Sequence, residues 1–155
     1  MKEIYTLNSD PLPWPPVPHD CLITDIRIQD RVLEFTFEED ISCHDSIKVL
    51  KPGAKSLVMR FNLCGDPYDQ ENLLIRLESA IKLRWWNPWK PFSPIQRCRI
   101  LDNKKLPGLA KGGRRLGYTD HFISRSSGTL IVRLSAMEEI QMEMYADAIE
   151  YEWIT

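Results

Sequence analysis

Each of the three histidines stands next to an aspartate, a pairing that can bind a metal ion. The pairs are His19-Asp20, His44-Asp45 and Asp120-His121. In phosphohydrolases such pairs lie on helices and are joined by further histidine and aspartate ligands. Here they fall at the ends of expected strands and in turns, where aspartate accepts hydrogen bonds from backbone amides. We therefore interpret each aspartate as a turn residue and each histidine as partly exposed.

No other motif of catalysis or cofactor binding stands out. Cys43-His44 could share a zinc ion with Cys21 and Cys64, but structural zinc sites usually contain a closely spaced cysteine pair. No serine lies in a G-x-S-x-G motif. Residues 110–115 are basic and glycine-rich but lack the strand–loop–helix order of a phosphate-binding loop. We predict no catalytic residue, no metal, no cofactor, and reduced thiols for the four cysteines.

A run of aromatic and basic residues spans 84–92, with the sequence RWWNPWKPF. Trp86, Trp89 and Phe92 could form a platform on which a base, a sugar or a partner's side chain stacks. The alternative is that these rings cover one end of the β-structure, with the stems of Arg84 and Lys90 lying over them. The sequence leaves both interpretations open.

The segment 103–117 is expected to be a long loop that carries five cations and no acid, namely Lys104, Lys105, Lys111, Arg114 and Arg115. Phosphate binding requires a cluster of this kind. Alternatively, the loop is a solvated connection, and the chain's own acidic strands neutralise the basic segment. We favour this second interpretation, which predicts cross-strand ion pairs of Arg97, Arg99 and Arg133 with Glu143, Glu150 and Glu152. A loop of this length in a compact domain still suggests a binding surface.

These cations belong to a wider segregation of charge along the chain. Residues 81–133 contain 12 lysines and arginines and two acids, whereas the rest contains 8 basic and 20 acidic residues. The formal net charge of −2 therefore conceals a basic segment inside an acidic remainder. Such a local field steers charged partners even when the total charge is near zero.

The elements that position these residues alternate between apolar and polar side chains with a period of two, which is typical of half-buried strands. We expect strands at 21–28, 33–37, 47–50, 57–63, 95–101, 118–124, 129–135, 140–146 and 149–153. The segment 71–86 resembles a helix in composition, being rich in Leu, Glu and Lys. However, six of its seven odd positions from 73 to 85 are apolar, so we predict one long strand, with a helix as the alternative.

The predicted fold class is all-β, or mostly β: an antiparallel β-sandwich or barrel-like meander of eight to ten strands with little helix. A length of 155 residues suits one domain, which we place at 19–155. Residues 1–18 form a proline-rich N-terminal arm, because five of the 11 prolines lie there. The chain shows neither a long apolar run nor an apolar leader, so we expect a cytoplasmic protein with no membrane partner.

Three stretches also resemble known sequences. Their patterns are His19-Asp20-Cys21-x-Ile23-x-x-Ile26, Leu33-x-Phe35-x-Phe37 and Ile149-x-Tyr151-x-Trp153. They are similar to small uncharacterised bacterial all-β proteins, some of which are grouped with the immunity proteins of polymorphic toxin systems. The resemblance implies a cytoplasmic, non-enzymatic protein that binds another protein, and it assigns no functional residue.

Two binding hypotheses and one enzymatic alternative follow. In the first, the chain binds a protein partner through Trp86, Trp89, Lys90, Phe92, Lys104, Lys105, Lys111, Arg114 and Arg115. In the second, the same surface binds a nucleic acid or another polyanion, with rings stacking on bases and cations contacting phosphates. In the third, the chain is an enzyme whose site has no recognisable motif.

Overall fold

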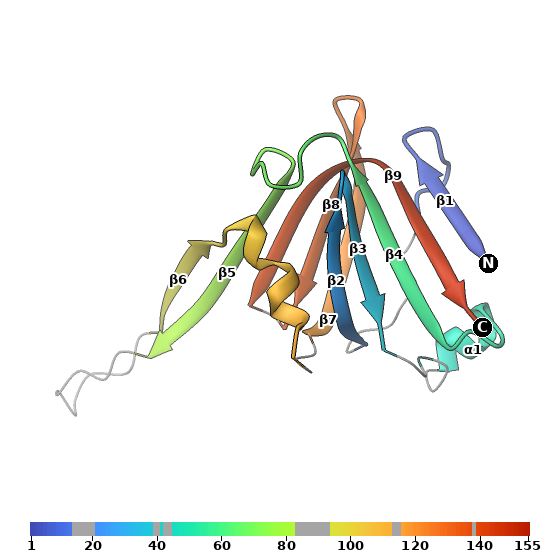
Figure 1. The fold of residues 1–155 in the computed structure, drawn as a ribbon, viewed down its shortest axis with the longest axis horizontal. Helices are drawn as coiled ribbons and strands as arrows, with labels where there is room; N and C mark the ends of the chain where they lie inside the picture. The colour runs from blue at the N-terminus through green and yellow to red at the C-terminus, as the bar shows by residue number, and fades with distance from the viewer. Residues whose placement is uncertain (14–20, 39–40, 42–44, 83–93, 113–115, 138) are drawn as a thin grey trace.

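The computed structural model describes residues 1–155 except 14–20, 39–40, 42–44, 83–93, 113–115 and 138, and at 79–82 and 94–97 it describes the backbone alone. The described residues form nine antiparallel strands, one α-helix and two short 3-10 helices (Figure 1). The strands are β1 (Lys2–Thr6), β2 (Leu22–Gln29), β3 (Val32–Phe37), β4 (Ser56–Leu63), β5 (Leu73–Lys82), β6 (Pro94–Ile100), β7 (Leu116–Ser126), β8 (Thr129–Ala136) and β9 (Ile140–Ile154). The helices are α1 (Asp45–Leu50), η2 (Asn103–Lys105) and η3 (Pro107–Ala110). The predicted fold class, mostly β and antiparallel with little helix, is confirmed.

Six of the strands close into a ring. Hydrogen bonds connect them in the order β4-β3-β2-β7-β8-β9, and β9 pairs again with β4. β5 and β6 extend the sheet from the first half of β9, and β1 pairs with its second half. One curved sheet therefore surrounds the core, and the barrel-like form of the prediction describes the fold better than two stacked sheets.

The closure depends on β9. Its first half pairs with β8 and β5, and its second half pairs with β4 and β1. Between the halves, Asn62 of β4 lies opposite Ala148, while the next residue, Leu63, lies opposite Ala146. Asp147 is therefore an extra residue in a β-bulge, which bends and twists the strand so that it can serve both halves of the sheet.

The bulge explains why the sequence suggested two strands, at 140–146 and 149–153, where the structure has one. Before Asp147 the buried positions are even-numbered, as at Met144, and after it they are odd-numbered, as at Ile149. A change of phase in the pattern looks like a strand end, whereas a bulge allows the backbone to continue.

The expectation of a strand at 47–50 was wrong, because this segment lies in α1. Ile47 is buried, but Val49, which a strand would place on the same face, is 78% exposed. The Lys51 amide donates to the Ile47 carbonyl at 2.7 Å, and Gly53 follows with a φ of 82°. Four residues are too few to separate the two periods. None of the helices in the described residues has the length and apolar character that a membrane crossing requires.

The N-terminal arm begins with a strand that the sequence analysis did not identify. β1 pairs antiparallel with β9, and Ile4 lies opposite Glu150. The proline-rich stretch that follows is described only as far as Pro13, so Trp14 lies outside the described residues. The first residues of the arm are therefore part of the sheet.

The structure also describes most of two further segments, 71–86 and 103–117, whose conformation the sequence analysis discussed. The long strand predicted over 71–86 is confirmed as β5 up to Lys82, beyond which the residues lie outside the described part. The expected loop at 103–117 instead contains η2 and η3, and β7 begins within it at Leu116. Of the basic residues there, Lys104 and Lys105 lie in a helical turn and Lys111 follows one.

The inside of the ring is filled by aromatic and aliphatic side chains. Phe35 packs edge-on against Phe61 with ring centroids 5.8 Å apart, and Phe37 packs in the same way against Tyr118. All four side chains are at most 1% exposed. The alternation of the strands directs these residues inward and their polar neighbours outward.

One polar chain crosses this core. His121 is 1% exposed, and its Nδ1 lies 2.8 Å from the Tyr118 hydroxyl and its Nε2 3.1 Å from the Tyr151 hydroxyl. Asp120 accepts a hydrogen bond from the amide of His121, but it lies within β7 and not at the predicted strand end or turn. The expectation that His121 is partly exposed was wrong, because both ring nitrogens contact tyrosine hydroxyls in the core of the barrel.

Burial lowers the pKa of His121 from 6.5 to about 4, although the charge of Asp120 opposes this shift. A histidine that is neutral in the native state and protonated in the unfolded state stabilises the fold above pH 6.5, and this contribution is lost as the pH falls towards 4. We expect wild type to lose about 2–3 kcal/mol from this group between pH 7 and 4.5. Urea unfolding of wild type and His121→Gln across this range measures the difference. An identical pH dependence of the two proteins would contradict the prediction.

Candidate functional site

The structure describes three of the nine residues predicted to form the binding surface. Lys104 and Lys105 lie in η2, Lys111 follows η3, and all three are exposed. The other six lie outside the described residues: Trp86, Trp89, Lys90, Phe92, Arg114 and Arg115. Their part in a surface stays a prediction, whereas the three lysines have a defined setting.

Local sequence determines the turns that carry these lysines. Asp102 caps η2, because its carboxylate accepts a hydrogen bond from the Lys104 amide at 3.1 Å. Pro107 begins η3, where its missing amide leaves no hydrogen bond unmade. Leu101 and Leu106, on either side of η2, are buried. Two apolar anchors therefore hold the turn against the core while the lysines between them face solvent.

Asn103 ties η2 to the sheet. Its side chain is 2% exposed, and Nδ2 donates to the carbonyl oxygens of Pro67 at 2.7 Å and Leu73 at 2.8 Å. These carbonyls belong to the connection from β4 to β5 and to the first residue of β5. The bonds bridge 36 and 30 residues of sequence, so nothing near Asn103 in the chain could have identified its role.

The connection from β4 to β5 brings carboxylates and an exposed ring beside the lysines. Asp66 accepts a hydrogen bond from the Tyr68 amide at 3.0 Å, and Asp69 accepts one from the Glu71 amide at 3.1 Å. Tyr68 adjoins a carbonyl that Asn103 binds, and it is 49% exposed. The surroundings of η2 therefore combine cations, carboxylates and an aromatic side chain.

The ion pairs predicted for the basic segment are confirmed only in part. Arg133 Nε lies 3.2 Å from Glu143 Oε2, across neighbouring positions of β8 and β9. The predicted use of Glu150 and Glu152 was wrong, because both bind cations from outside the basic segment. Arg99 is exposed and makes no ion pair with any described residue, and the side chain of Arg97 lies outside the description.

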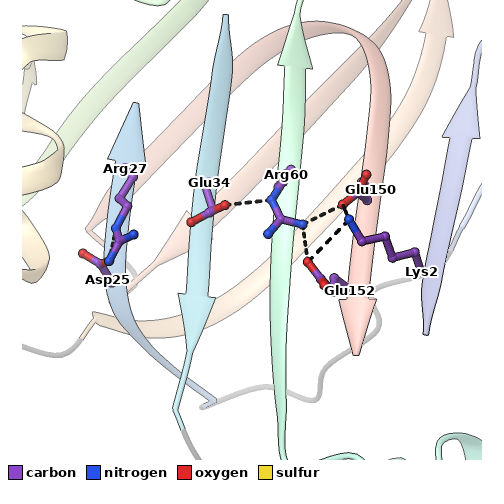
Figure 2. Close-up of polar contacts among 7 residues, drawn as sticks. All are labelled: Lys2, Asp25, Arg27, Glu34, Arg60, Glu150 and Glu152. Atoms are coloured by element: carbon purple, nitrogen blue, oxygen red, sulfur yellow. Dashed lines mark hydrogen bonds and ion pairs between the residues drawn. The ribbon is translucent and has the colours of Figure 1, made fainter. Parts of the chain in front are cut away.

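Glu150 and Glu152 both bind Arg60 of β4 (Figure 2). Its Nε lies 2.7 Å from Glu34 Oε2, and its Nη1 lies 2.6 Å from Glu150 Oε1 and 2.5 Å from Glu152 Oε2. Lys2 of β1 adds a contact of 3.3 Å to Glu150. Partial burial lowers the pKa of Arg60, but the hydrogen bonds to the three glutamates outweigh this effect, so its pKa is raised.

Strand register aligns this network as a row of alternating charge on the outside of the barrel. Arg27 lies opposite Glu34, Glu34 opposite Arg60, and Arg60 opposite Glu150, across β2, β3, β4 and β9. Opposite charges at directly facing positions stabilise antiparallel pairs. Glu150 and Glu152 of β9 are thereby matched within the acidic part of the chain.

The cations near η2 have no such match. Arg99, Lys104, Lys105 and Lys111 are exposed, and none lies within 4.0 Å of a carboxylate among the described residues. We call these four residues the basic surface. The carboxylates expected to neutralise the basic segment bind other cations instead, apart from Glu143, which pairs with Arg133.

The structure describes some of the residues that the sequence suggested as metal ligands. Within the described ranges no group of three or more His, Cys, Asp and Glu residues could hold a metal ion. Cys64 and Cys98 are free thiols, whereas Cys43 and His44 lie outside these ranges. A surface hollow of about 460 Å³ crosses β5, β9 and β8 and includes the ion pair of Arg133 and Glu143.

Replacing Arg60 tests whether the row of charges stabilises the barrel. In Arg60→Met the carboxylates of Glu34, Glu150 and Glu152 lose their shared partner while the apolar stem is kept. We expect the free energy of unfolding to fall by about 1–3 kcal/mol at pH 7. The control is Arg27→Met. The Arg27 side chain is 73% exposed and, among the described residues, pairs with Asp25 alone. We therefore expect this control to change the free energy of unfolding by less than about 0.5 kcal/mol.

The same two variants should also differ in how their free energy of unfolding depends on pH. A hydrogen bond from Arg60 lowers the pKa of Glu152 below 4.5, so this carboxylate stabilises the fold above that pH and ceases to do so as the pH falls through its native value. Arg60→Met should remove this part of the acid sensitivity, and Arg27→Met should keep it. Equal acid sensitivity of all three proteins in urea unfolding would show that the network has no such role.

Asn103→Ala tests the anchor of η2. The change leaves two buried carbonyl acceptors without a donor, so we expect a loss of about 1–3 kcal/mol of unfolding free energy. Lys104→Ala, at the neighbouring exposed position, should be close to neutral. Thermal unfolding of both variants beside wild type measures this, and equal melting temperatures would rule out an anchoring role.

The function of this surface has to be inferred from its own residues, because comparison with known proteins identifies no relative. No family model, no curated protein and no solved structure matches the chain.

Proposed function

We propose that this chain is a non-enzymatic binding protein that docks an acidic protein partner on the basic surface formed by Arg99, Lys104, Lys105 and Lys111. The observation that carries the proposal is the lack of ion-pair partners for these four cations among the described residues. Exposed charge of one sign that the fold does not neutralise favours encounter with a partner of the opposite sign.

The neighbourhood of the basic surface supports a protein partner. Tyr68 is 49% exposed and Ile100 is 52% exposed, and both lie on segments that adjoin η2. Protein interfaces combine apolar and aromatic contacts with arginine in this way. Because Asn103 holds η2 to the sheet, the surface is preorganised, which reduces the entropy lost on binding.

The distribution of acids argues against a polyanion as the partner. Asp102 caps η2, and Asp66, Asp69 and Glu71 lie in the adjoining connection from β4 to β5. A continuous run of phosphates would meet these carboxylates as well as the lysines. A folded protein can place single acidic groups opposite single cations.

The proposal extends to the setting in which binding takes place. A cytoplasmic location is supported by the free thiols of Cys64 and Cys98, since disulfides are rare in reducing compartments. The resemblance to proteins grouped with toxin immunity factors supports an inhibitory role in which the partner is a toxin. In that role the basic surface covers an acidic face of the toxin.

The test compares two triple charge reversals of equal size. One changes Lys104, Lys105 and Lys111 to Glu. Its control changes Arg31, Lys48 and Lys55 to Glu, three exposed cations outside the basic segment. Tagged wild type, variant and control are used to purify partners from the cytosol of the native host, and bound proteins are quantified by mass spectrometry.

We expect one acidic protein that wild type and control retain equally and that the variant retains at least about tenfold less, because the electrostatic attraction is reversed only there. Equal retention by all three proteins would exclude the basic surface. Nuclease-sensitive retention, together with binding of a random single-stranded oligonucleotide that weakens steeply with salt, would replace the protein partner by a polyanion.

A further inference from the structure

β6 is an edge strand with an open side. It ends the path of the sheet and, among the strands that the structure describes, pairs with β5 alone, in a register that sets Arg76 opposite Ile100 and Leu77 opposite Arg99. Figure 1 shows the β5–β6 hairpin projecting from the ring, so that the outer side of β6 faces away from the barrel. On that side none of the seven residues of β6 pairs with another strand in the described part of the chain.

The hydrogen-bond pattern identifies which backbone groups are exposed there. The Leu101 amide donates to the Ile75 carbonyl at 2.9 Å, so the odd-numbered residues of β6 direct their amides and carbonyls towards β5. In an antiparallel ladder the intervening residues point the other way. The amides and carbonyls of Gln96, Cys98 and Ile100 thus face the open side.

The other edge strand of the sheet, β1, is shorter than β6. β1 has five residues, and a turn finishes it where the Thr6 amide donates to Ser9 Oγ at 2.9 Å and the Ser9 amide donates to the Thr6 carbonyl at 3.0 Å. Short strands and tight turns are common protections of sheet edges. Among the described residues, no element covers β6 on its outer side.

The charge around β6 identifies the occupant that suits this edge. A second copy of the chain is disfavoured, because antiparallel self-pairing centred on Cys98 would set Arg97 of one copy opposite Arg99 of the other. An acidic strand is favoured, since Arg99 is exposed in β6 and Lys104 and Lys105 lie just beyond its end.

We propose that the partner adds an extended acidic segment to the open edge of β6, pairing its backbone with Gln96, Cys98 and Ile100. This inference rests on the proposed function and specifies its binding mode, strand addition. Arg99 and Ile100 occupy opposite faces of the strand. The segment therefore alternates, with acidic residues on the Arg99 face and apolar residues on the Ile100 face.

The first experiment measures amide exchange by NMR with a defined probe. The probe is a synthetic peptide of about eight residues that alternates glutamate and valine, matched to the length of an ordinary strand. Strand addition should slow exchange at the amides of Gln96, Cys98 and Ile100 at least about tenfold and leave Arg97 and Arg99, already bonded to β5, unchanged. No binding at about 1 mM peptide, or protection elsewhere such as β1, would overturn the proposal.

The second experiment removes one edge amide. Cys98→Pro deletes a donor on the open side and no bond to β5, and proline is tolerated on edge strands. We expect it to weaken peptide binding at least about tenfold, while Cys98→Ala, which keeps the amide, binds as wild type does. Should the proline variant not fold, a peptide N-methylated at alternate residues removes the same bonds from the other side. Equal binding of the methylated and unmethylated peptides would overturn strand addition.

These outcomes separate the binding mode from the proposed function. If the charge-reversal variant loses the cytosolic partner but that partner leaves the exchange of Cys98 and Ile100 unchanged, the function stands and strand addition fails. If the peptide binds β6 but no acidic protein is retained from cytosol, the proposed function fails. A concentration-dependent dimer in sedimentation velocity that Cys98→Pro abolishes would replace the acidic segment by a second copy of the chain.

Discussion

Everything in this fold depends on one strand making four pairings. β9 reaches both β8 and β5 with its first half and both β4 and β1 with its second, and the bulge at Asp147 allows it to do so. Because side chains alternate between faces, a shift of one residue without a bulge would direct the apolar residues of the second half outward. The extra residue restores the correct face, and the sheet closes around a single core.

Closure of the ring also determines where charge is matched. It brings β4 beside β9, and with it Arg60 beside Glu150 and Glu152. Glu150 and Glu152 are therefore neutralised by residues from their own part of the chain, whereas Glu143 pairs with Arg133 of the basic segment. Arg99 of β6 and the lysines of η2 make no ion pair with these carboxylates. The position of the candidate surface therefore follows from which strands lie next to one another in the barrel.

Local patterns in the sequence predicted the strands well and their long-range partners poorly. The period of two identified β2, β3, β4 and β5, even where composition suggested a helix. It failed at α1, where a single buried residue, Ile47, defines the inner side. It could not indicate that Asn103 binds the Leu73 carbonyl or that His121 lies between two tyrosines. Those partners come from strands distant in the chain, and only the closed sheet brings them together.

The candidate surface was predictable only in outline. The clustering of lysines at 104, 105 and 111 was visible from charge alone, but the turns that carry them were expected to be an open loop. Glu143 was assigned to the correct cation, but Glu150 and Glu152 were not, because Arg60 is 90 residues from Glu150 and only strand register reveals that they meet. The tryptophan-rich segment at 84–92 lies outside the described residues, and its role stays a prediction.

The position of β9 in the chain has a consequence for how the molecule assembles. The strand that completes the barrel follows all the others in sequence, so during synthesis β4, β5 and β8 emerge before their common neighbour exists. Contacts of such long sequence separation slow folding, and strands awaiting a partner are prone to associate with other chains. The nascent protein is thus most vulnerable to aggregation before β9 emerges, and a chaperone that shields unpaired strands until then would raise its yield.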